Sequence, residues 1–200
     1  MKNLLFLIFC LLFSGPSFSQ IVTDVDAIYP FYGELSAVRK SGTWGFINKE
    51  GVLKINYRSD IVLNNDSNEK YPIFKNGRCL VKRLIDNIYM YGFIDENGND
   101  VVTPQYLNAS NFENGYAIVV KLLKDTIGYN EVFRKPLTKY KLEEYIIDVS
   151  GKTIKYLENP IEYIIPKRTQ LTPPKIHSKF IAPGIVAVQN KNKKWNIYKY

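Results

Sequence analysis

The sequence predicts an all-β fold in which antiparallel hairpin units follow one another along the chain. Three observations favour this class. Among 200 residues there are 15 Tyr and 11 Phe but only 2 Met, and such aromatic residues favour pleated, half-buried surfaces. Two short glycine-containing motifs recur in a constant order, and no long amphipathic helical pattern occurs. Hydrophobic residues make up 46% and charged residues 23% of the chain, which is typical of a globular protein.

Residues 1–19 have the features of a secretory signal peptide. Lys2 provides a positive start, and Leu4 to Phe13 form an apolar run of ten residues. Small residues then precede an expected cleavage site between Ser19 and Gln20. Because ten apolar residues are too few to span a bilayer, we expect cleavage rather than an anchor. The mature chain should be exported to the periplasm, the outer surface or the medium, without a transmembrane segment.

Cleavage at this site also removes one of the two cysteines. Cys79 then remains as the only thiol of the mature chain, so no internal disulfide can form. Bulky Phe9 before Cys10 argues against a lipid anchor at that cysteine. Cys79 lies in an apolar stretch, which predicts a buried and unreactive side chain.

The first recurring motif is a turn that opens with Asn or Asp and closes with Gly. It occurs in Trp44–Gly51, Tyr91–Gly98 and Glu144–Gly151, and a truncated fourth copy starts at Lys194. The Asx side chain caps such a turn, and Gly accepts the positive φ of a hairpin. Apolar residues flank each turn, so each copy predicts a short antiparallel meander.

The second motif precedes each hairpin. Its copies are Phe31–Val38, Phe74–Val81, Phe112–Val119 and, more loosely, Phe180–Val188. One small meander cannot bury its apolar face alone, so neighbouring units must stack. We expect a twisted, solenoid-like array, with a closed β-barrel as the alternative.

In the first unit we expect strands near residues 34–40, 43–48 and 52–56. Gly45 and Gly92 fall inside strands, which indicates that another group crosses close to the backbone there. An aromatic ring of a neighbouring strand, such as that of Phe31 or Phe74, is the expected occupant. The expected core includes Trp44, Phe46, Phe93, Ile94, Ala117, Val119, Ile147 and Val186.

These motifs resemble the bacterial WG-repeat (KWG) family. Trp44–Gly51 and Phe112–Val119 match the family pattern closely, and residues 101–106 match the apolar strand that ends near Pro-x-Tyr. Tyr91 and Glu144 depart from it, since both stand where the family has Trp. The resemblance implies an exported or envelope-associated β-repeat protein with an interaction role and no known catalytic residues. The signature positions are Gly33, Trp44, Gly45, Gly51, Gly77, Gly92, Gly98, Gly115, Gly151 and Trp195.

The chain therefore divides into four parts. After the signal peptide, residues 20–156 hold repeats one to three, and the third carries an insertion near 121–143. The best helix candidate lies within it, at 138–145. Residues 157–178 are rich in Pro and predict an extended loop or linker, and residues 179–200 form a basic, truncated fourth repeat.

Positive charge is concentrated at the C-terminal end. Residues 20–162 hold 18 basic and 19 acidic side chains, whereas residues 163–200 hold 8 basic and no acidic ones. This excess indicates a patch for an acidic partner, such as an envelope glycolipid, an acidic polysaccharide or an acidic protein. The alternative is that the lysines maintain solubility and keep an edge strand unpaired. The candidate polyanion-binding residues are Lys167, Arg168, Lys191, Lys193, Lys194 and Lys199.

Signals for catalysis, cofactors and metals are missing from the sequence. His177 is the only histidine, and it lies in a Pro-rich stretch. Glu143 and Glu144 are adjacent, so in a strand they point to opposite faces. The run Asp95–Asp100 lacks the Gly and Glu spacing of a calcium loop, and no glycine-rich phosphate loop occurs. We expect no catalytic residue, no cofactor and no metal.

Together these features predict an exported, non-catalytic binding or scaffolding module for a protein or glycan surface. Stacked repeats create extended surfaces rather than deep pockets, and exposed Tyr and Trp often anchor protein and sugar ligands. One alternative is a polyanion or envelope-surface binder that acts through the basic C-terminal segment, and another is a hydrolase. Nucleic acid is not an expected partner because the protein is exported.

Overall fold

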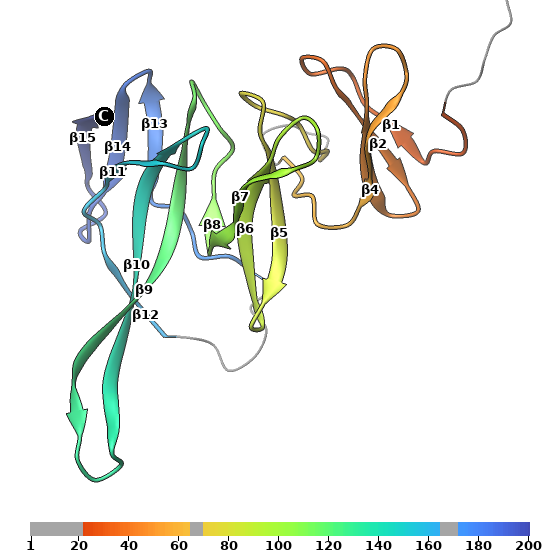
Figure 1. The fold of residues 1–200 in the computed structure, drawn as a ribbon. Coiled ribbons are helices and arrows are strands. Elements are labelled where there is room, and N and C mark those ends of the chain that lie inside the picture. Colours follow the sequence, from red (N-terminus) through yellow and green to blue (C-terminus); the bar gives the residue numbers. More distant parts are fainter. Residues whose placement is uncertain (1–21, 65–69, 165–171) are drawn as a thin grey trace, which may run out of the picture.

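A computed structural model describes residues 22–64, 70–164 and 172–200. The predicted signal peptide with Cys10 lies outside these ranges, as do Lys167 and Arg168. The described chain is all-β, and its strands form four small antiparallel sheets that follow one another in chain order (Figure 1). We call these sheets units one to four.

Units one and two are simple meanders in which consecutive strands pair. Unit one consists of β1 (Ala27–Ile28), β2 (Ser36–Lys40), β3 (Thr43–Ile47) and β4 (Leu53–Arg58). Unit two consists of β5 (Cys79–Ile85), β6 (Ile88–Ile94) and β7 (Asp100–Tyr106).

Unit three is the largest sheet, with strand order β11-β10-β9-β8 and β12 paired to β10. Its strands are β8 (Asn108–Ala109), β9 (Tyr116–Asn130), β10 (Lys135–Asp148), β11 (Thr153–Tyr156) and β12 (Ile161–Tyr163). Unit four consists of β13 (Ser178–Ala182), β14 (Ile185–Gln189) and β15 (Trp195–Lys199). All four sheets are open, so the described strands do not close into a single barrel.

Strand register confirms the alignment of the repeat motifs. The equivalent cross-strand pairs are Val38 with Gly45, Val81 with Gly92, Val119 with Tyr145, and Val188 with Asn196. The four units thus share one hairpin register despite their different residues.

One turn geometry recurs four times because an Asx side chain specifies it. The Oδ1 atoms of Asn48, Asp95, Asp148 and Asn190 each accept a hydrogen bond from the backbone N–H four residues later, at 2.8, 2.9, 3.0 and 3.0 Å. The first three are the predicted turns. The fourth connects β14 to β15 and therefore precedes Trp195, whereas the three predicted turns follow the strands β3, β6 and β10. It lies at a different place in the repeat, and Lys193 occupies the position of the closing Gly.

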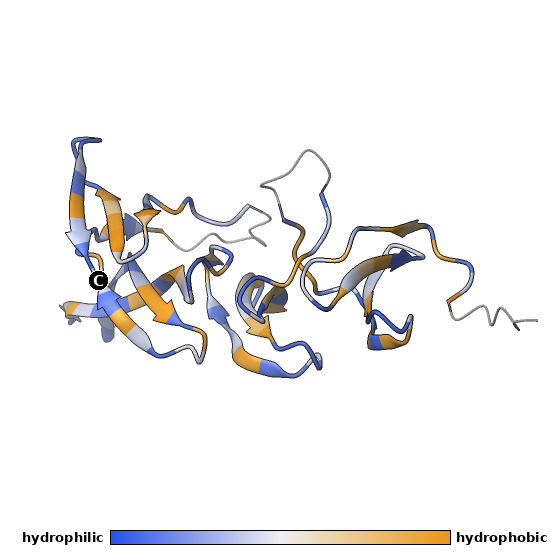
Figure 2. Cartoon of the chain, turned by 90° about the horizontal axis from the view of Figure 1, so that it is seen from above, coloured by the Kyte–Doolittle hydropathy of each residue, from blue (hydrophilic) through white to orange (hydrophobic). Residues whose placement is uncertain are grey.

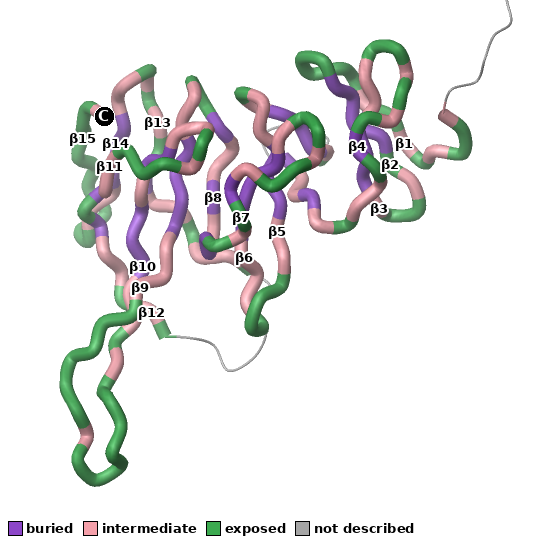
Figure 3. The backbone as a smooth tube through the Cα atoms, in the orientation of Figure 1, coloured by how far each residue is buried: buried purple, intermediate pink, exposed green. Residues whose placement is uncertain are grey.

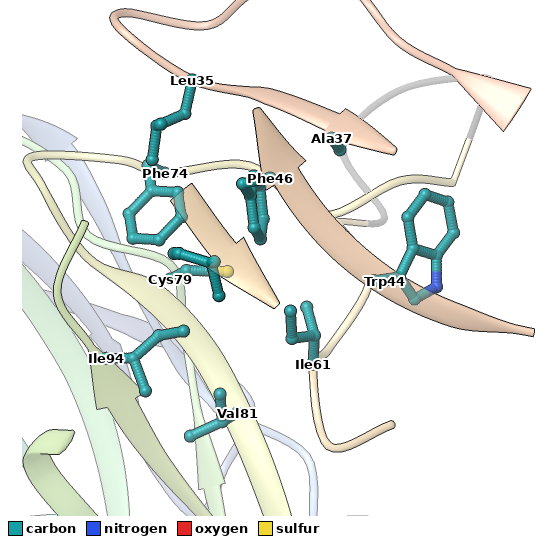
Figure 4. Packing of buried hydrophobic residues seen from close by; sticks show 10 residues of the cluster. Leu35, Ala37, Trp44, Phe46, Ile61, Phe74, Cys79, Val81 and Ile94 are labelled. Atoms are coloured by element: carbon teal, nitrogen blue, oxygen red, sulfur yellow. The ribbon is translucent and has the colours of Figure 1, made fainter. Parts of the chain in front are cut away.

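Hydrophobic residues recur along the strands of the units (Figure 2). Neighbouring units bury such residues against each other, as Figure 4 shows for units one and two. Between units one and two, the rings of Phe46 and Phe74 meet edge to face at 4.8 Å. Phe93 and Phe112 repeat this contact at 4.7 Å between units two and three. A third cluster joins Ile118 and Ile146 of unit three to Val186 of unit four. All eight residues expected in the core are buried, which confirms that prediction.

Backbone of the third strand makes the closest approach to both Gly45 and Gly92, and at Gly92 the prediction of an aromatic ring is wrong. At Gly45 a ring of the adjacent strand does lie nearby, since Tyr57 Cδ1 would be 3.2 Å from an added Cβ, but it is not the ring of Phe31 or Phe74. A Cβ atom on Gly45 would lie 2.9 Å from the carbonyl oxygen of Ile55, and one on Gly92 would lie 2.3 Å from that of Val102. The register shifts at both places, between Trp44 and Phe46 and between Tyr91 and Phe93. Such a β-bulge bends the third strand of the unit over the glycine.

The closing glycines of the second and third Asx turns also contact the preceding unit. Gly98 has a φ of 84°, and a Cβ there would lie 3.3 Å from Ile55 Cγ2. Gly151 has a φ of 86°, and a Cβ there would lie 2.8 Å from Val102 Cγ2. Arginine side chains reinforce both contacts: Arg58 donates to the carbonyl of Gly98 at 3.0 Å, and Arg78 to that of Val149 at 2.8 Å.

The insertion in unit three is a two-stranded arm. β9 and β10 remain paired out to Asn130 and Lys135, and the outer part of the hairpin projects from the other sheets as an exposed ribbon (Figure 3). The predicted helix at 138–145 is wrong, because these residues belong to β10. At the other end of β9 and β10, away from the arm, unit three keeps the register of the other units, with Ala117 opposite Ile147.

Part of the segment 157–178 is also more regular than the predicted loop. Ile161–Tyr163 form β12, which pairs with β10, and both Leu157 and Asn159 are buried. Further along, the carbonyl of Pro174 accepts a hydrogen bond from Asn108 at 2.8 Å. No helix in the described ranges is long and apolar enough to cross a membrane.

Candidate functional site

Unit four carries the basic residues that the sequence selects. The turn between β14 and β15 is held by Asn190, whose Oδ1 accepts hydrogen bonds from the N–H groups of Asn192 and Lys194, both at 3.0 Å. The N–H of Lys193 donates to the Asn190 carbonyl at 2.9 Å. This small, defined turn presents Lys191, Lys193 and Lys194 together, and all three are exposed.

Lys193 has a backbone conformation that favours glycine. Its φ is 58°, and the corresponding positions of the other three Asx turns are Gly51, Gly98 and Gly151. A side chain in the left-handed region costs about 1–2 kcal/mol. Among the described residues, Lys193 is one of nine residues other than Gly with a positive φ.

The Asn190 turn forms one wall of a cleft of about 900 Å³. Gln189 to Lys193 line this side, Glu158 to Glu162 line the opposite side, and Lys175 and His177 also contribute to the lining. The two walls are more than twenty-five residues apart in sequence, and the tertiary structure brings them together.

Three lysines and two glutamates line the cleft, so its charged side chains have a net charge of +1. Lys175, Lys191 and Lys193 line it, and none of them forms an ion pair among the described residues. The acidic residues in the lining are Glu158 and Glu162. Lys139 Nζ lies 2.5 Å from the carboxylate of Glu162, and this hydrogen bond lowers the pKa of Glu162. One of the two negative charges is therefore already matched from outside the cleft.

A buried carboxylate connects the segments that form the cleft. Glu144 accepts hydrogen bonds from Asn159 Nδ2 at 2.8 Å, from the N–H of His177 at 2.5 Å and from the hydroxyl of Ser178. It thereby holds the 158–162 wall and the start of unit four against β10. Strand register shows that Glu144 stands at the position of Trp44 and Tyr91, so the departure from the repeat pattern has a structural role.

The predicted polyanion-binding residues fall into three groups. Lys191 and Lys193 line the cleft, whereas Lys194 and Lys199 are exposed outside it, next to and on β15. Lys167 and Arg168 lie outside the described ranges. The structure adds Lys175, which the charge count includes but the motif analysis does not select, because its place in the cleft depends on contacts between distant segments.

Trp195 differs from its counterparts in the other units. It is 47% exposed, whereas Trp44 and Tyr91 are 7% and 6% exposed. Lys179 Nζ lies 4.8 Å from the centre of the Trp195 ring, a cation–π distance. A lysine and an open aromatic ring thus share the exposed side of unit four.

Glu143 and Cys79, two other side chains that could take part in a reaction, have structural roles instead. Glu143 accepts a hydrogen bond from the hydroxyl of Tyr145 at 2.5 Å and lies 3.1 Å from Lys141 Nζ, away from the partners of Glu144. Burial raises the pKa of the Cys79 thiol to about 12, which keeps it protonated and unreactive at neutral pH. Within residues 22–64, 70–164 and 172–200, no group of three His, Cys, Asp or Glu side chains could hold a metal ion.

Comparison with known proteins identifies one segment of the chain. Neither the curated proteins nor the solved structures contain a match. The family model of the WG containing repeat matches residues 91–121. This span starts at the Tyr91-Gly92-Phe93-Ile94 hairpin of unit two and ends in β9 of unit three. Residues 91–121 are therefore a WG containing repeat, as the motif resemblance predicted.

Proposed function

We propose that the chain is an exported, non-catalytic binding module whose unit four binds an acidic partner on a protein or glycan surface. The basic cleft carries this proposal. It places Lys175, Lys191 and Lys193 around one hollow, together with the hydrogen-bonding side chains of Asn190 and Asn192. Amines and amides in this arrangement suit carboxylate or sulfate groups.

The repeats act as the scaffold for this surface. We infer that the four units stack into one twisted, solenoid-like array, because each shares a core with the next and two turn glycines repeat the same contact between units. An array of this kind holds its terminal unit at a fixed orientation. Signal-peptide cleavage after Ser19 would deliver the array, starting at Gln20, to the envelope or beyond.

The first prediction tests the basic cleft by charge reversal. Changing Lys191, Lys193 and Lys194 to Glu should abolish retention of the mature protein on immobilised heparin, an acidic polysaccharide. The attraction is lost and the new carboxylates repel the ligand. Elution of the unmodified protein should require salt in the range that screens charge pairs, about 0.1–0.5 M.

A matched control variant distinguishes the effect of the cleft lysines on heparin retention from the effect of net charge. Lys54, Lys135 and Lys152 are also exposed but lie outside the cleft. Changing them to Glu alters the net charge by the same amount as the first triple substitution. This variant should be retained nearly as well as the original protein. Equal loss in both triple variants would mean that retention follows overall charge, and the lysines of unit four would then serve solubility.

A further inference from the structure

Unit four has one strand edge that its counterparts in the other units do not leave open. β3 pairs with both β2 and β4, β6 with both β5 and β7, and β10 with β9 and β11. β15 is the equivalent strand, yet within the described ranges it pairs with β14 alone. All five of its residues are exposed.

The backbone groups on this edge can be assigned from the hydrogen bonds to β14. The carbonyl of Lys194 accepts from the N–H of Asn190, and the N–H of Tyr200 donates to the carbonyl of Gly184. Because successive residues of an antiparallel strand alternate in direction, even-numbered residues of β15 bond to β14. The N–H and C=O groups of Trp195, Ile197 and Lys199 therefore point to the open edge.

The same positions are paired in the complete units. Trp44 and Phe46, the counterparts of Trp195 and Ile197, pair with Arg58 and Ile55 of β4. In unit two, Tyr91 and Phe93 pair with Tyr106 and Val102 of β7. In units one and two the added strand places an apolar residue opposite the counterpart of Ile197, whereas in unit three Lys155 lies opposite Ile146. Ile197 is itself 67% exposed in unit four.

We propose that an extended acidic polypeptide segment adds to β15 as the third strand of unit four. The open backbone groups favour a polypeptide over a glycan because they repeat at the spacing of a β-strand. Exposed Ile197 and Trp195 offer contacts to alternate side chains. Charge complementarity determines the sign of the partner, since Lys193, Lys194 and Lys199 are exposed on β15 and in the turn before it, and Lys179 Nζ of β13 lies 4.8 Å from the centre of the Trp195 ring. This inference rests on the proposed function and specifies the partner and its mode of binding.

The test uses a synthetic peptide of about nine residues in which Glu and Val alternate. Its affinity for the mature protein is measured by fluorescence anisotropy. We expect saturable binding that weakens at least about tenfold when all backbone nitrogens of the peptide are methylated, which removes the N–H donors from both edges of the extended peptide. Methylation retains every charge and side chain but removes the donors that a strand needs. Equal affinity of the two peptides overturns the proposal.

A substitution in β15 tests the same edge through a change in the protein instead of in the peptide. Ile197→Pro removes one outward N–H and blocks strand addition, while leaving the β14 ladder intact because that N–H points away from β14. We expect it to lose peptide binding to the same extent, whereas Ile197→Ala keeps the donor and should bind better than the Pro variant. Unchanged binding by Ile197→Pro, with an unchanged circular dichroism spectrum, also overturns the proposal.

Heparin distinguishes this inference from the proposed function. Strand addition predicts that Ile197→Pro is retained on heparin like the original protein, because that retention depends on lysines alone. If heparin retention depends on Lys191, Lys193 and Lys194 but peptide affinity is insensitive to methylation, the basic site stands and strand addition fails. If the charge-reversed variant still binds heparin, the proposed function itself fails.

Discussion

The third strand of unit two passes so close to Gly92 that a side chain has no space there. An added Cβ would lie 2.3 Å from the carbonyl oxygen of Val102 and 2.6 Å from the nitrogen of Pro104. Both contacts are with backbone, which cannot rotate away as a side chain can. Gly92 therefore permits the bulge that brings β7 over β6.

Gly92→Ala should lower the free energy of unfolding by about 2–4 kcal/mol, because the clash forces the bulged strand away from β6. Urea denaturation followed by Tyr and Trp fluorescence measures the change.

Gly128→Ala is the matched control, since it also lies in a strand but its Cβ would meet nothing closer than Leu137 Cδ1 at 3.8 Å. Its effect should stay within about 0.5 kcal/mol. Equal stability of the two variants would contradict the steric role of Gly92.

At the scale of elements, the arm of unit three is paired but almost unburied. Its outer residues hold the exposed apolar side chains Ile127, Tyr129, Val132, Phe133 and Leu137. Between the paired residues Lys124 and Tyr140, no side chain is buried. The ladder hydrogen bonds shape this ribbon, while the packing that stabilises the fold lies in the body of the unit.

Replacing residues 125–139 by Asn-Gly should therefore leave the thermal midpoint within a few degrees of its original value. Asn-Gly forms the tight turn of a two-residue hairpin. The replacement removes the surface ion pairs of Lys139 with Glu162 and of Asp125 with Lys141, which contribute little. Differential scanning calorimetry measures the midpoint.

Ile147→Ala, in the body of the same strand pair, is the comparison. Ile147 is fully buried, and its truncation should destabilise the protein by about 2–4 kcal/mol. A large loss on shortening the arm would mean that the outer hairpin stabilises the body.

For the whole molecule, a chain of charges joins units one and two. Asp60 lies 2.6 Å from Arg58 Nε and 2.9 Å from Arg83 Nε, and Arg83 lies 2.6 Å from Asp100. Partial burial alone would raise the pKa of Asp60, but the hydrogen bonds from both arginines outweigh it and lower that pKa. The hydrogen bond from Arg83 likewise lowers the pKa of Asp100.

A lowered pKa makes this link sensitive to acid. The unfolded chain binds protons at a higher pH than the folded one, so Asp60 stabilises the fold above its ordinary pKa of 3.8, and the contribution is lost as the pH falls through the lowered value. Asp60→Asn should be less stable than the original protein near neutral pH, and the difference should shrink well below 3.8. Urea denaturation at a series of pH values measures it.

Glu34→Gln is the control for this comparison, because it removes an exposed ion pair with Lys49 and should change stability little at either pH. A difference for Asp60→Asn that is constant with pH would show that its carboxylate charge does not stabilise the link.

Short stretches of sequence determine much of the fold. An Asx residue and a Gly determine a turn over four residues through hydrogen bonds that they themselves form, so the three hairpins, their register and the buried residues could be predicted. The fourth Asx turn could not be predicted, because it precedes Trp195 whereas the motif turns follow the equivalent strand, and because Lys193 stands where those turns have Gly. The β-bulge over Gly92 was foreseen as a close approach, but the approaching group depends on the path of another strand.

The sequence by itself thus determined the strand class, the hairpin turns, the core positions and the basic character of the C-terminal end. Only the tertiary structure decided that β12 returns to β10, that Glu144 anchors Asn159 and Ser178, and that Lys175 joins Lys191 in one cleft. Turn and strand signals act between near neighbours and can be read locally. Contacts between segments tens of residues apart depend on how whole sheets stack, which no short stretch of sequence specifies.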